Sequence, residues 1–379
     1  MRRRLVTAIQ LFLALLGTKP LPAQEAAWPT WHGDSTLRGH VAAMLPDSPV
    51  RAWQVRLDAP VVLPPVSDGK RVFCISERGK LVAVDFRGQE LWSTTFTNRV
   101  SAPLLAVDGL TVLATESGMV CAFQAETGKT NWTYQAGDRI QGGVNFWADP
   151  TGRLAAIVII TQPSGILHAV DPQTGRKLWV SPETGRTDGS PAVGNDLVVF
   201  GNCGAAFQLV CTKTGRKLGE IPLGEGCEMA GGTVLAEGWA FAGNRSGSLV
   251  AADIKSGRPV WRFKGAEEEL FTTPAVSNDR VILLAPNGTV YALKRKTGQK
   301  LWQFQTGATG DGAPAVAGDK VVIAAAGSLW LLRLSDGALV WKTRLSDRIT
   351  SPAIARNLIL VGTDEGYLVA FGSGEKHDR

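Results

Sequence analysis

The chain is poor in the residues on which most catalytic and metal sites depend. Its 379 residues include 4 His and 5 Cys, with no two Cys adjacent and no CxxC pair. The His residues lack metal-ligand spacing, so we expect each to be solvated or to lie in a turn. GxSxG, P-loop and GxGxxG motifs are absent as well. Most of the Cys residues are expected to be buried free thiols. The residues concerned are His32, His40, His168 and His377, with Cys74, Cys121, Cys203, Cys211 and Cys227.

An excess of charge of one sign is also lacking. The formal net charge is +6, but Arg2, Arg3, Arg4 and Lys19 lie in a segment that we expect to be removed. Without these four, 36 basic residues face 34 acidic ones. So small an excess gives no electrostatic argument for binding DNA or RNA.

Only one long apolar run is present, and it lies at the N-terminus. It extends from Leu5 to Gly17, follows three Arg residues and precedes a Pro-containing stretch that ends at Gln24. This pattern is typical of a secretory signal and too short for a comfortable membrane span. We therefore predict that residues 1–24 are cleaved on export to the periplasm or envelope, with an uncleaved anchor as the alternative. Because the next Cys is Cys74, no lipid-modified N-terminal Cys is expected.

What the sequence has in quantity is a repeat of about 40 residues. A Gly, one variable residue and an apolar residue recur, and a Trp follows six of these motifs after 14 residues, or 13 in the first. The motifs begin at Gly79, Gly118, Gly165, Gly247, Gly288, Gly327 and Gly366. Ala205-Ala-Phe207 stands in the same place in the middle of the series, but position 219, where its Trp should follow, is Gly.

Each unit reads as four short antiparallel strands joined by tight turns. In the second unit the strands are predicted near 100–106, 112–115, 120–124 and 131–135. Four strands at this period are typical of a β-propeller blade. The sequence therefore predicts an all-β protein made of tandem blades.

The unit count predicts eight blades and a ring closed by the N-terminus. Gly366 opens an eighth unit whose Trp would fall past the chain end, while Trp53 lies one period before Trp92. We expect a strand at 50–55 to complete the blade begun by 349–371, which removes the free edges. Seven or nine blades are the alternatives, because Gly39-His-Val41 also stands 14 residues before Trp53. The predicted organisation is a signal peptide at 1–24, an N-terminal extension at 25–46, the propeller at 47–374 and a tail at 375–379.

The repeated Trp is predicted to be structural. Burying an indole contributes roughly 5 kcal/mol of transfer free energy. Its ring can lie flat on the Gly of a neighbouring turn, where no Cβ intervenes. Such contacts would tie each blade to the next, with a weaker contact at Gly219; stacking of a ligand on these rings is the alternative. The set comprises Trp53, Trp92, Trp132, Trp179, Trp261, Trp302 and Trp341.

Two units carry a recognisable motif. Residues 169–179 read Ala-Val-Asp-Pro-Gln-Thr-Gly-Arg-Lys-Leu-Trp, and residues 251–261 read Ala-Ala-Asp-Ile-Lys-Ser-Gly-Arg-Pro-Val-Trp. They resemble the quinoprotein (PQQ)-like propeller repeat, over about residues 50–371. The opening Trp28-Pro-Thr-Trp31-His-Gly33 is similar to a segment found ahead of such propellers in bacterial envelope proteins. The resemblance implies either a PQQ-dependent alcohol or sugar dehydrogenase or a non-catalytic BamB-like scaffold, since the repeat specifies fold better than function.

The dehydrogenase branch implies features that this sequence lacks. Those enzymes are longer chains with an adjacent Cys pair, a Trp floor under the cofactor, and Ca²⁺ beside a catalytic Asp. We therefore favour a BamB-like, monomeric, protein-binding propeller of the envelope, with no cofactor and no catalytic residue. The alternatives are an oxidoreductase that uses PQQ with calcium and a carbohydrate-binding propeller. The missing lipid-attachment Cys departs from the BamB pattern and argues against lipid anchoring.

The repeat register also locates a candidate binding site. Residues just before the Pro-apolar pair of each innermost strand should face the central funnel. Both signs of charge meet there, which predicts either a polar pocket for a peptide or small polar ligand or a solvated rim of paired charges. The candidates are Arg99, Asp138, Arg139, Asp188, Glu228, Glu269, Asp311, Asp347 and Arg348.

Overall fold

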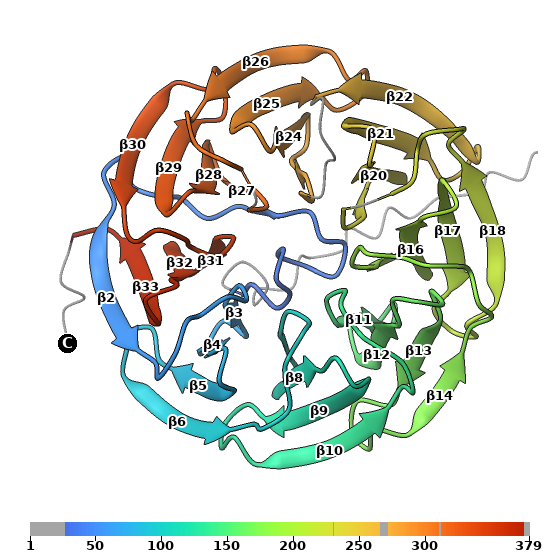
Figure 1. Cartoon of the computed structure of the whole chain (residues 1–379), viewed down its shortest axis with the longest axis horizontal. Helices are drawn as coiled ribbons and strands as arrows, with labels where there is room; N and C mark the ends of the chain where they lie inside the picture. The colour runs from blue at the N-terminus through green and yellow to red at the C-terminus, as the bar shows by residue number, and fades with distance from the viewer. Residues whose placement is uncertain (1–26, 230, 266–271, 311, 375–379) are drawn as a thin grey trace, which may run out of the picture.

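The computed structural model of the chain describes residues 27–229, 231–265, 272–310 and 312–374. Within these residues, eight sheets of antiparallel strands surround a central axis as the blades of a propeller (Figure 1). The predicted eight-bladed all-β ring is therefore confirmed. The predicted signal peptide and the tail at 375–379 lie outside the described residues.

Blades are numbered here in chain order. Of the four strands named for each blade, the first lies nearest the central axis. Blade 1 comprises β3 (Val66–Ser67), β4 (Val72–Ile75), β5 (Lys80–Val84) and β6 (Glu90–Thr95). Blade 2 comprises β7 (Leu105–Val107), β8 (Leu110–Ala114), β9 (Met119–Gln124) and β10 (Thr130–Gln135). Blade 3 comprises β11 (Asn145–Ala148), β12 (Leu154–Ile160), β13 (Leu167–Val170) and β14 (Lys177–Val180). Blade 4 comprises β15 (Ala192–Gly194), β16 (Leu197–Asn202), β17 (Ala206–Cys211) and β18 (Lys217–Pro222).

The second half of the ring repeats this order. Blade 5 comprises β19 (Val234–Ala236), β20 (Trp239–Gly243), β21 (Ser248–Asp253) and β22 (Arg258–Lys264). Blade 6 comprises β23 (Ala275–Val276), β24 (Arg280–Leu284), β25 (Thr289–Lys294) and β26 (Lys300–Gln305). Blade 7 comprises β27 (Ala315–Ala317), β28 (Lys320–Ala325), β29 (Ser328–Arg333) and β30 (Leu339–Arg344). Blade 8 comprises β31 (Ala353–Ala355), β32 (Leu358–Gly362), β33 (Tyr367–Gly372) and, from the N-terminus, β2 (Val50–Arg56).

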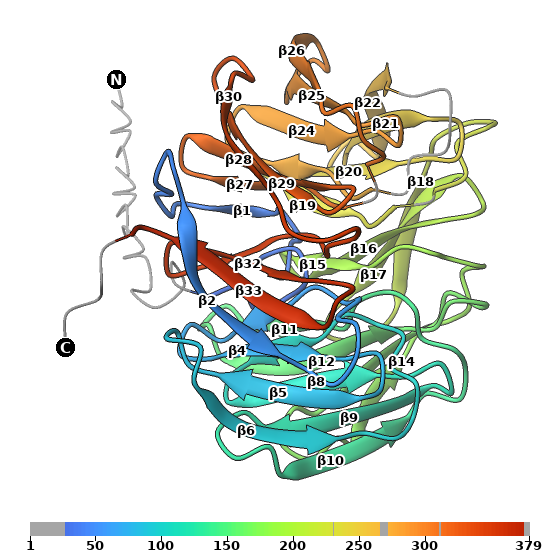
Figure 2. The ribbon, with the colours of Figure 1, turned by 60° about the vertical axis from the view of Figure 1, so that its left-hand side comes forward.

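The ring closes as the repeat count predicts. β2 pairs antiparallel with β33, with Trp53 opposite Ala370, and the two strands lie side by side in Figure 2. The competing motif Gly39-His-Val41 starts no ninth blade. Its residues form β1 (His40–Val41), which adds to the inner edge of blade 7 by pairing parallel with β27.

The innermost strands are shorter than the sequence suggests. In blade 2 the predicted strand at 100–106 is reduced to β7 (Leu105–Val107), preceded by a single bridge between Val100 and Thr115. Pro103 lies between the two pieces and has no backbone N–H to donate, so the ladder is interrupted there.

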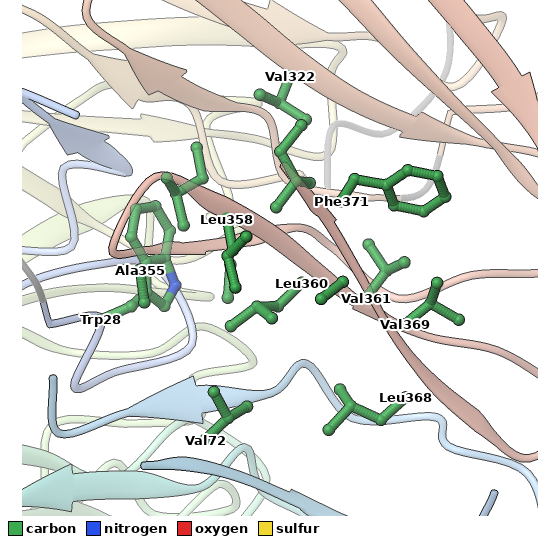
Figure 3. Close-up of a cluster of buried hydrophobic side chains, with 14 of the residues drawn as sticks. Trp28, Val72, Val322, Ala355, Leu358, Leu360, Val361, Leu368, Val369 and Phe371 are labelled. Carbon is green, nitrogen blue, oxygen red and sulfur yellow. The ribbon is translucent and has the colours of Figure 1, made fainter. Parts of the chain in front are cut away.

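Burial follows the position of a strand within its blade. In β24 every residue from Val281 to Leu284 is buried, because neighbouring blades cover both faces of the middle strands. The outer strand β22 instead alternates between exposed and half-buried residues. The largest apolar cluster joins blades 7, 8 and 1, and Figure 3 shows Trp28 beside the side chains of blade 8 in it. Blade 8 thus packs against Trp28, a residue of the segment that precedes the propeller.

The repeated Trp residues reach from one blade to the next. Trp92 Nε1 donates a hydrogen bond of 3.0 Å to the Ala125 carbonyl, and a Cβ on Gly128 would lie 2.5 Å from Trp92 Cε3. Only glycine fits beneath the indole, because the ring occupies the place of a side chain. An equivalent hydrogen bond, from the indole Nε1 to a backbone carbonyl of the next blade at 2.8–3.0 Å, is made by Trp53, Trp132, Trp179, Trp261 and Trp302.

Candidate functional site

One end of the ring's channel is crossed by the chain's own N-terminal segment. Residues 28–41 run over the inner strands, and Figure 1 shows this blue segment across the centre of the ring. Six blades donate backbone N–H groups to its carbonyl oxygens, from Ser67, Ala106, Val193, Leu235, Val276 and Val316. Blade 3 adds the Asn145 side-chain amide, which donates to the Ser35 carbonyl at 2.8 Å. We call this side of the ring the closed end.

Two stacked rings lie at the closed end. His32 is 1% exposed and stacks on Trp31 with ring centroids 5.1 Å apart. Its Nε2 lies 3.1 Å from the Pro274 carbonyl oxygen, to which the neutral ring can donate. Burial lowers the pKa of His32 to about 4, although the bond to Pro274 favours the protonated form. The imidazole is therefore neutral at ordinary pH and serves as packing.

The expectation that the His residues are solvated or in turns is wrong for His168, which is buried in a strand, whereas His32 lies in a turn but is not solvated. His32 is buried in the closed end, and His168 lies in β13 with its Nδ1 2.9 Å from the Tyr134 hydroxyl oxygen. Burial lowers the pKa of His168 as well. Both rings have hydrogen-bond partners, which removes the cost of placing them inside. His377 lies outside the described residues.

The opposite side of the ring, here called the open mouth, is made by the loops that precede the inner strands and by the tips of the hairpins between second and third strands. Arg99, Arg139, Glu228 and Arg348 each stand one residue before a bridge that starts an inner strand. Their carbonyls accept hydrogen bonds from hairpin-tip N–H groups, as in Glu116 to Arg99 at 3.3 Å. The candidates Glu269 and Asp311 lie outside the described residues.

Blades 2 and 3 bring two of the predicted Arg residues around one carboxylate. Glu116 lies 3.8 Å from Arg99 and 3.6 Å from Arg139, measured from Oε1 to the guanidinium nitrogens. The Arg99 side chain is 75% exposed, so this is a loose, solvated contact. Asp138 accepts a hydrogen bond from the Arg139 N–H at 2.8 Å. Asp347 is turned to Arg344 at 2.7 Å and is 86% exposed.

Asp188 is a candidate that is held tightly. Its side chain is only 9% exposed and accepts hydrogen bonds from Gln162 at 2.7 Å, Arg186 at 3.0 Å and Arg245 at 2.7 Å. Burial alone would raise the pKa of Asp188, but the bonds from Gln162, Arg186 and Arg245 outweigh it and lower the pKa. The carboxylate thus fixes three side chains from three blades at one side of the open mouth.

The sequence register missed the hairpin-tip partners. Glu116 and Arg245 stand two residues before Gly118 and Gly247, in the same repeat position as Asp364 before Gly366. This fixed offset is a signal that sequence reasoning could have used. The open mouth is consequently lined by two residue series, one from the loops and one from the hairpin tips.

A pocket of about 230 Å³ also opens at the mouth between blades 8 and 1. Val61, Val62 and Pro64 give it an apolar wall, and Arg348 and Asp364 give it charge. The Val62 side chain is 55% exposed. Apolar walls with a few polar groups are the usual make-up of a site that receives a side chain or small ligand.

The residues of the open mouth that the structure describes do not fit PQQ with calcium. In the part of the chain that the structure describes, no three His, Cys, Asp or Glu side chains converge as metal ligands. Asp188 is already occupied by Gln162 and two Arg residues. All five Cys residues are free thiols, and Cys74, Cys121 and Cys227 are buried. The mouth therefore offers charged and apolar contacts rather than a coordination site.

Comparison with known proteins agrees with this architecture. The sequence profile of a family described as outer membrane protein assembly factor BamB matches residues 37–218 and 208–377. The chain belongs to this family. A curated relative with this description, from Burkholderia pseudomallei, is 27% identical to this chain over 295 residues, and the match covers 72% of this chain and 74% of the relative. The Escherichia coli relative is 24% identical over 309 residues, covering 73% and 76%.

Solved structures show how widely the fold of this family member is shared. BamB from Moraxella catarrhalis has a TM-score of 0.71 at 20% identity and covers 87% of this chain and 99% of that chain. A europium-containing methanol dehydrogenase has a TM-score of 0.79 at 12% identity and covers 92% and 98%. At such identities the likeness concerns the fold alone, which an enzyme and an assembly factor share. Among the described residues no helix is long and apolar enough to span a bilayer.

Proposed function

We propose that this protein is a non-catalytic, protein-binding scaffold of the bacterial cell envelope that takes part in the assembly of outer-membrane proteins. The observation that carries the proposal is the match of residues 37–218 and 208–377 to the family of outer membrane protein assembly factor BamB. No cofactor is assigned, because the mouth residues do not fit PQQ with calcium. We assign the mature chain to the periplasm or the envelope, without an N-terminal lipid.

The open mouth is the surface that we assign to the protein partner. Residues 28–41 cross the closed end and accept backbone hydrogen bonds from six blades, so we assign the partner to the opposite side of the ring. Loops and hairpin tips make up the mouth, and loops carried on a rigid scaffold commonly bind partners. The exposed Arg99 and Arg139 can meet acidic groups, and the pocket at Val62 can take an apolar side chain.

Affinity capture from envelope extract tests the proposal. The mature, tagged chain should retain subunits of the outer-membrane β-barrel assembly machine, identified by mass spectrometry. A variant with Arg99→Glu and Arg139→Glu should capture less of them, because its charge is reversed at the mouth. The matched control is Glu126→Lys at an exposed turn on the side of the closed end, which should capture as much as the wild type. Equal loss in both variants would remove the mouth from the proposal.

A deletion strain and two activity assays separate the remaining alternatives. Loss of the gene should lower the level of folded outer-membrane β-barrel proteins, and the wild-type gene should restore it. Dye reduction by alcohols or sugars after addition of PQQ and Ca²⁺ would replace the scaffold with an oxidoreductase. Specific binding on a glycan array would favour a carbohydrate-binding propeller instead.

A further inference from the structure

Six contacts between neighbouring blades share one arrangement, here called the indole seam. A Trp on the outer strand of one blade lies on a glycine in the last turn of the next blade. Its Nε1 donates to a carbonyl two or three residues before that glycine, as Trp179 does to Thr212 at 2.8 Å beside Gly215. The six glycines are all buried or half-buried: Gly88, Gly128, Gly175, Gly215, Gly298 and Gly337.

The seam between blades 4 and 5 has the same frame without the ring. Gly219 in β18 takes the place of the Trp, and the glycine that the ring would cover is Gly257. A Cβ on Gly257 would meet nothing within 4 Å, and this glycine is exposed. The carbonyl in the acceptor position is that of Ile254, to which no group among the described residues donates a hydrogen bond. Gly257 and Ile254 thus form an indole seat that no residue of blade 4 fills.

The neighbouring strand fills this gap only in part. The cross-strand partner of the Trp is Ala in six blades, as in Trp302 opposite Ala292, whereas Leu209 stands opposite Gly219. Leu209 is half-buried and packs on the core of blades 4 and 5. It replaces some of the missing apolar volume near the strand but leaves Gly257 uncovered. The inner part of this seam is therefore packed by Leu209, while its outer rim, at Gly257, stays uncovered.

The charged side chains around Gly257 favour an acidic ligand. Exposed Arg216, Lys255 and Arg258 lie on the turns and strand starts that border this rim, and no ion pair is found for them among the described residues. Three of the nearby acids are in ion pairs: Asp196 with Lys213 at 2.7 Å, Glu220 with Lys217 at 2.7 Å, and Glu237 with Arg295. Asp253 accepts a hydrogen bond from the Ser256 N–H at 2.7 Å and keeps its charge, so three cations face one carboxylate outside these pairs. Positive charge is thus left over beside the vacant seat.

A cavity continues inward from the rim. It measures about 550 Å³ and is lined by Ile254, Lys255 and Leu235, and by Arg38, Asp34 and Glu237. Both acids are in ion pairs, Asp34 with Arg38 and Glu237 with Arg295. Its size leaves room for residues on either side of an aromatic anchor. Segments of this chain outside the described residues contain no Trp, so the chain itself offers no spare indole to fill the seat.

We propose that the seam between blades 4 and 5 is a docking site for a Trp side chain carried on an acidic, extended segment of a partner protein. The six indole seams serve as the template: the visiting ring lies on Gly257 and donates its N–H to the Ile254 carbonyl, while flanking carboxylates face Lys255 and Arg258. Aromatic anchors that enter a formed pocket are common centres of binding energy. This site is separate from the open mouth.

The test compares the wild-type site with the site of a variant in which a Trp of the chain itself covers Gly257. The probe is a synthetic peptide with one Trp between Glu residues, and the comparison peptide has Ala in place of Trp. Leu209→Ala with Gly219→Trp recreates the Ala–Trp pair of the six indole seams and occupies the seat from within. The matched control is Leu209→Ala alone, which leaves the seat open. Binding is followed by fluorescence anisotropy and by the amide resonance of Gly257, which an indole would shift through its ring current.

The expected result is that wild type and Leu209→Ala bind the Trp peptide alike, with a shifted Gly257 signal, while the Ala peptide does not bind. The double variant should bind more than about tenfold more weakly and should unfold at a higher temperature than Leu209→Ala, which confirms that the new ring has docked. Lys255→Glu should weaken binding without moving the melting temperature.

Three results would overturn the proposal. These are equal binding of the peptide by all variants, the absence of a Gly257 shift at millimolar peptide, and a wild-type dimer that the double variant loses, since a second copy would then be the occupant. None of these results bears on the open mouth. Conversely, a failure of envelope capture through the mouth leaves the peptide experiment intact.

Discussion

The two ends of the ring's channel are built in different ways. At the closed end, residues 28–41 are held by backbone hydrogen bonds from six blades, and Trp28 and His32 are buried. At the open mouth, backbone hydrogen bonds join the loops to the hairpin tips, but the charged side chains are held by solvated ion pairs, with nearly buried Asp188 as an exception. Backbone bonds and buried rings make the closed end a structural element. Solvated charge is weakly held and remains available to a partner.

The closed end should be the more sensitive to small changes, and Gly39→Ala gives the largest expected effect. Gly39 has φ +59°, and a Cβ there would lie 2.5 Å from His32 Nε2. Backbone strain and overpacking together should cost about 2–5 kcal/mol of unfolding free energy. The control is Gly109→Ala, which has φ +76° but open space around its Cβ and should cost about 1–2 kcal/mol. Equal losses in urea denaturation would show that the closed end is not tightly packed.

The same end should make stability depend on pH. The pKa of His32 is 6.5 in the unfolded chain and about 4 in the folded one. Between these values the unfolded chain binds a proton that the folded chain excludes, so stability that is present above pH 6.5 is lost as pH falls towards 4. The loss should reach at most roughly 3 kcal/mol.

Urea denaturation across this pH range, with His32→Asn as the comparison, measures the effect. The variant cannot take up the proton, so its profile should be flatter than that of the wild type, whatever its stability at neutral pH. Parallel profiles would mean that His32 is not the group responsible, and would point instead to half-buried His40 or to His168.

At the open mouth the expected effects are smaller and depend on burial. Asp188→Asn removes the charge that holds Arg186 and Arg245 and should cost about 1–3 kcal/mol, because the carboxylate is nearly buried. Thermal or chemical denaturation of the variant measures this loss. An unchanged midpoint would show that the Asp188 cluster does not contribute to folding.

Glu116→Gln is expected to have the smallest effect. Its carboxylate lies 3.6 and 3.8 Å from two solvated Arg side chains, so the variant should stay within about 0.5 kcal/mol of the wild type. Raised salt should remove even this difference. A loss as large as that of Asp188→Asn would contradict the view that this side of the mouth is held loosely.

The repeat explains which parts of the fold could be predicted from the sequence. A fixed period encodes the number of blades, the pairing of β2 with β33 and the absence of a ring at position 219. The path of residues 28–41 could not be predicted, because its contacts are mainly between backbone groups, which leave no side-chain pattern. The inner strand predicted at 100–106 is longer than the observed one for a local reason, because Pro103 interrupts the ladder of backbone hydrogen bonds.

The candidate site was predictable in position but not in pairing. In the structure, Arg99, Arg139 and Arg348 stand directly before the bridges that start the inner strands, and their part in binding stays a prediction. It could not reveal that Asp188 bonds to Arg245, because the two residues are 57 positions apart and belong to different series of the repeat. Such pairs depend on how far one blade is rotated from the next, which a single sequence does not state.

The most direct test of the central claim, that the open mouth binds the outer-membrane β-barrel assembly machine, is site-specific photo-crosslinking in the source bacterium. A photoreactive amino acid is placed at position 99 in the mouth and, in a separate strain, at position 126 on the opposite side. The account predicts crosslinks from position 99 to a subunit of the outer-membrane β-barrel assembly machine and none from position 126. Crosslinks to that machine from position 126 with none from position 99 would contradict it.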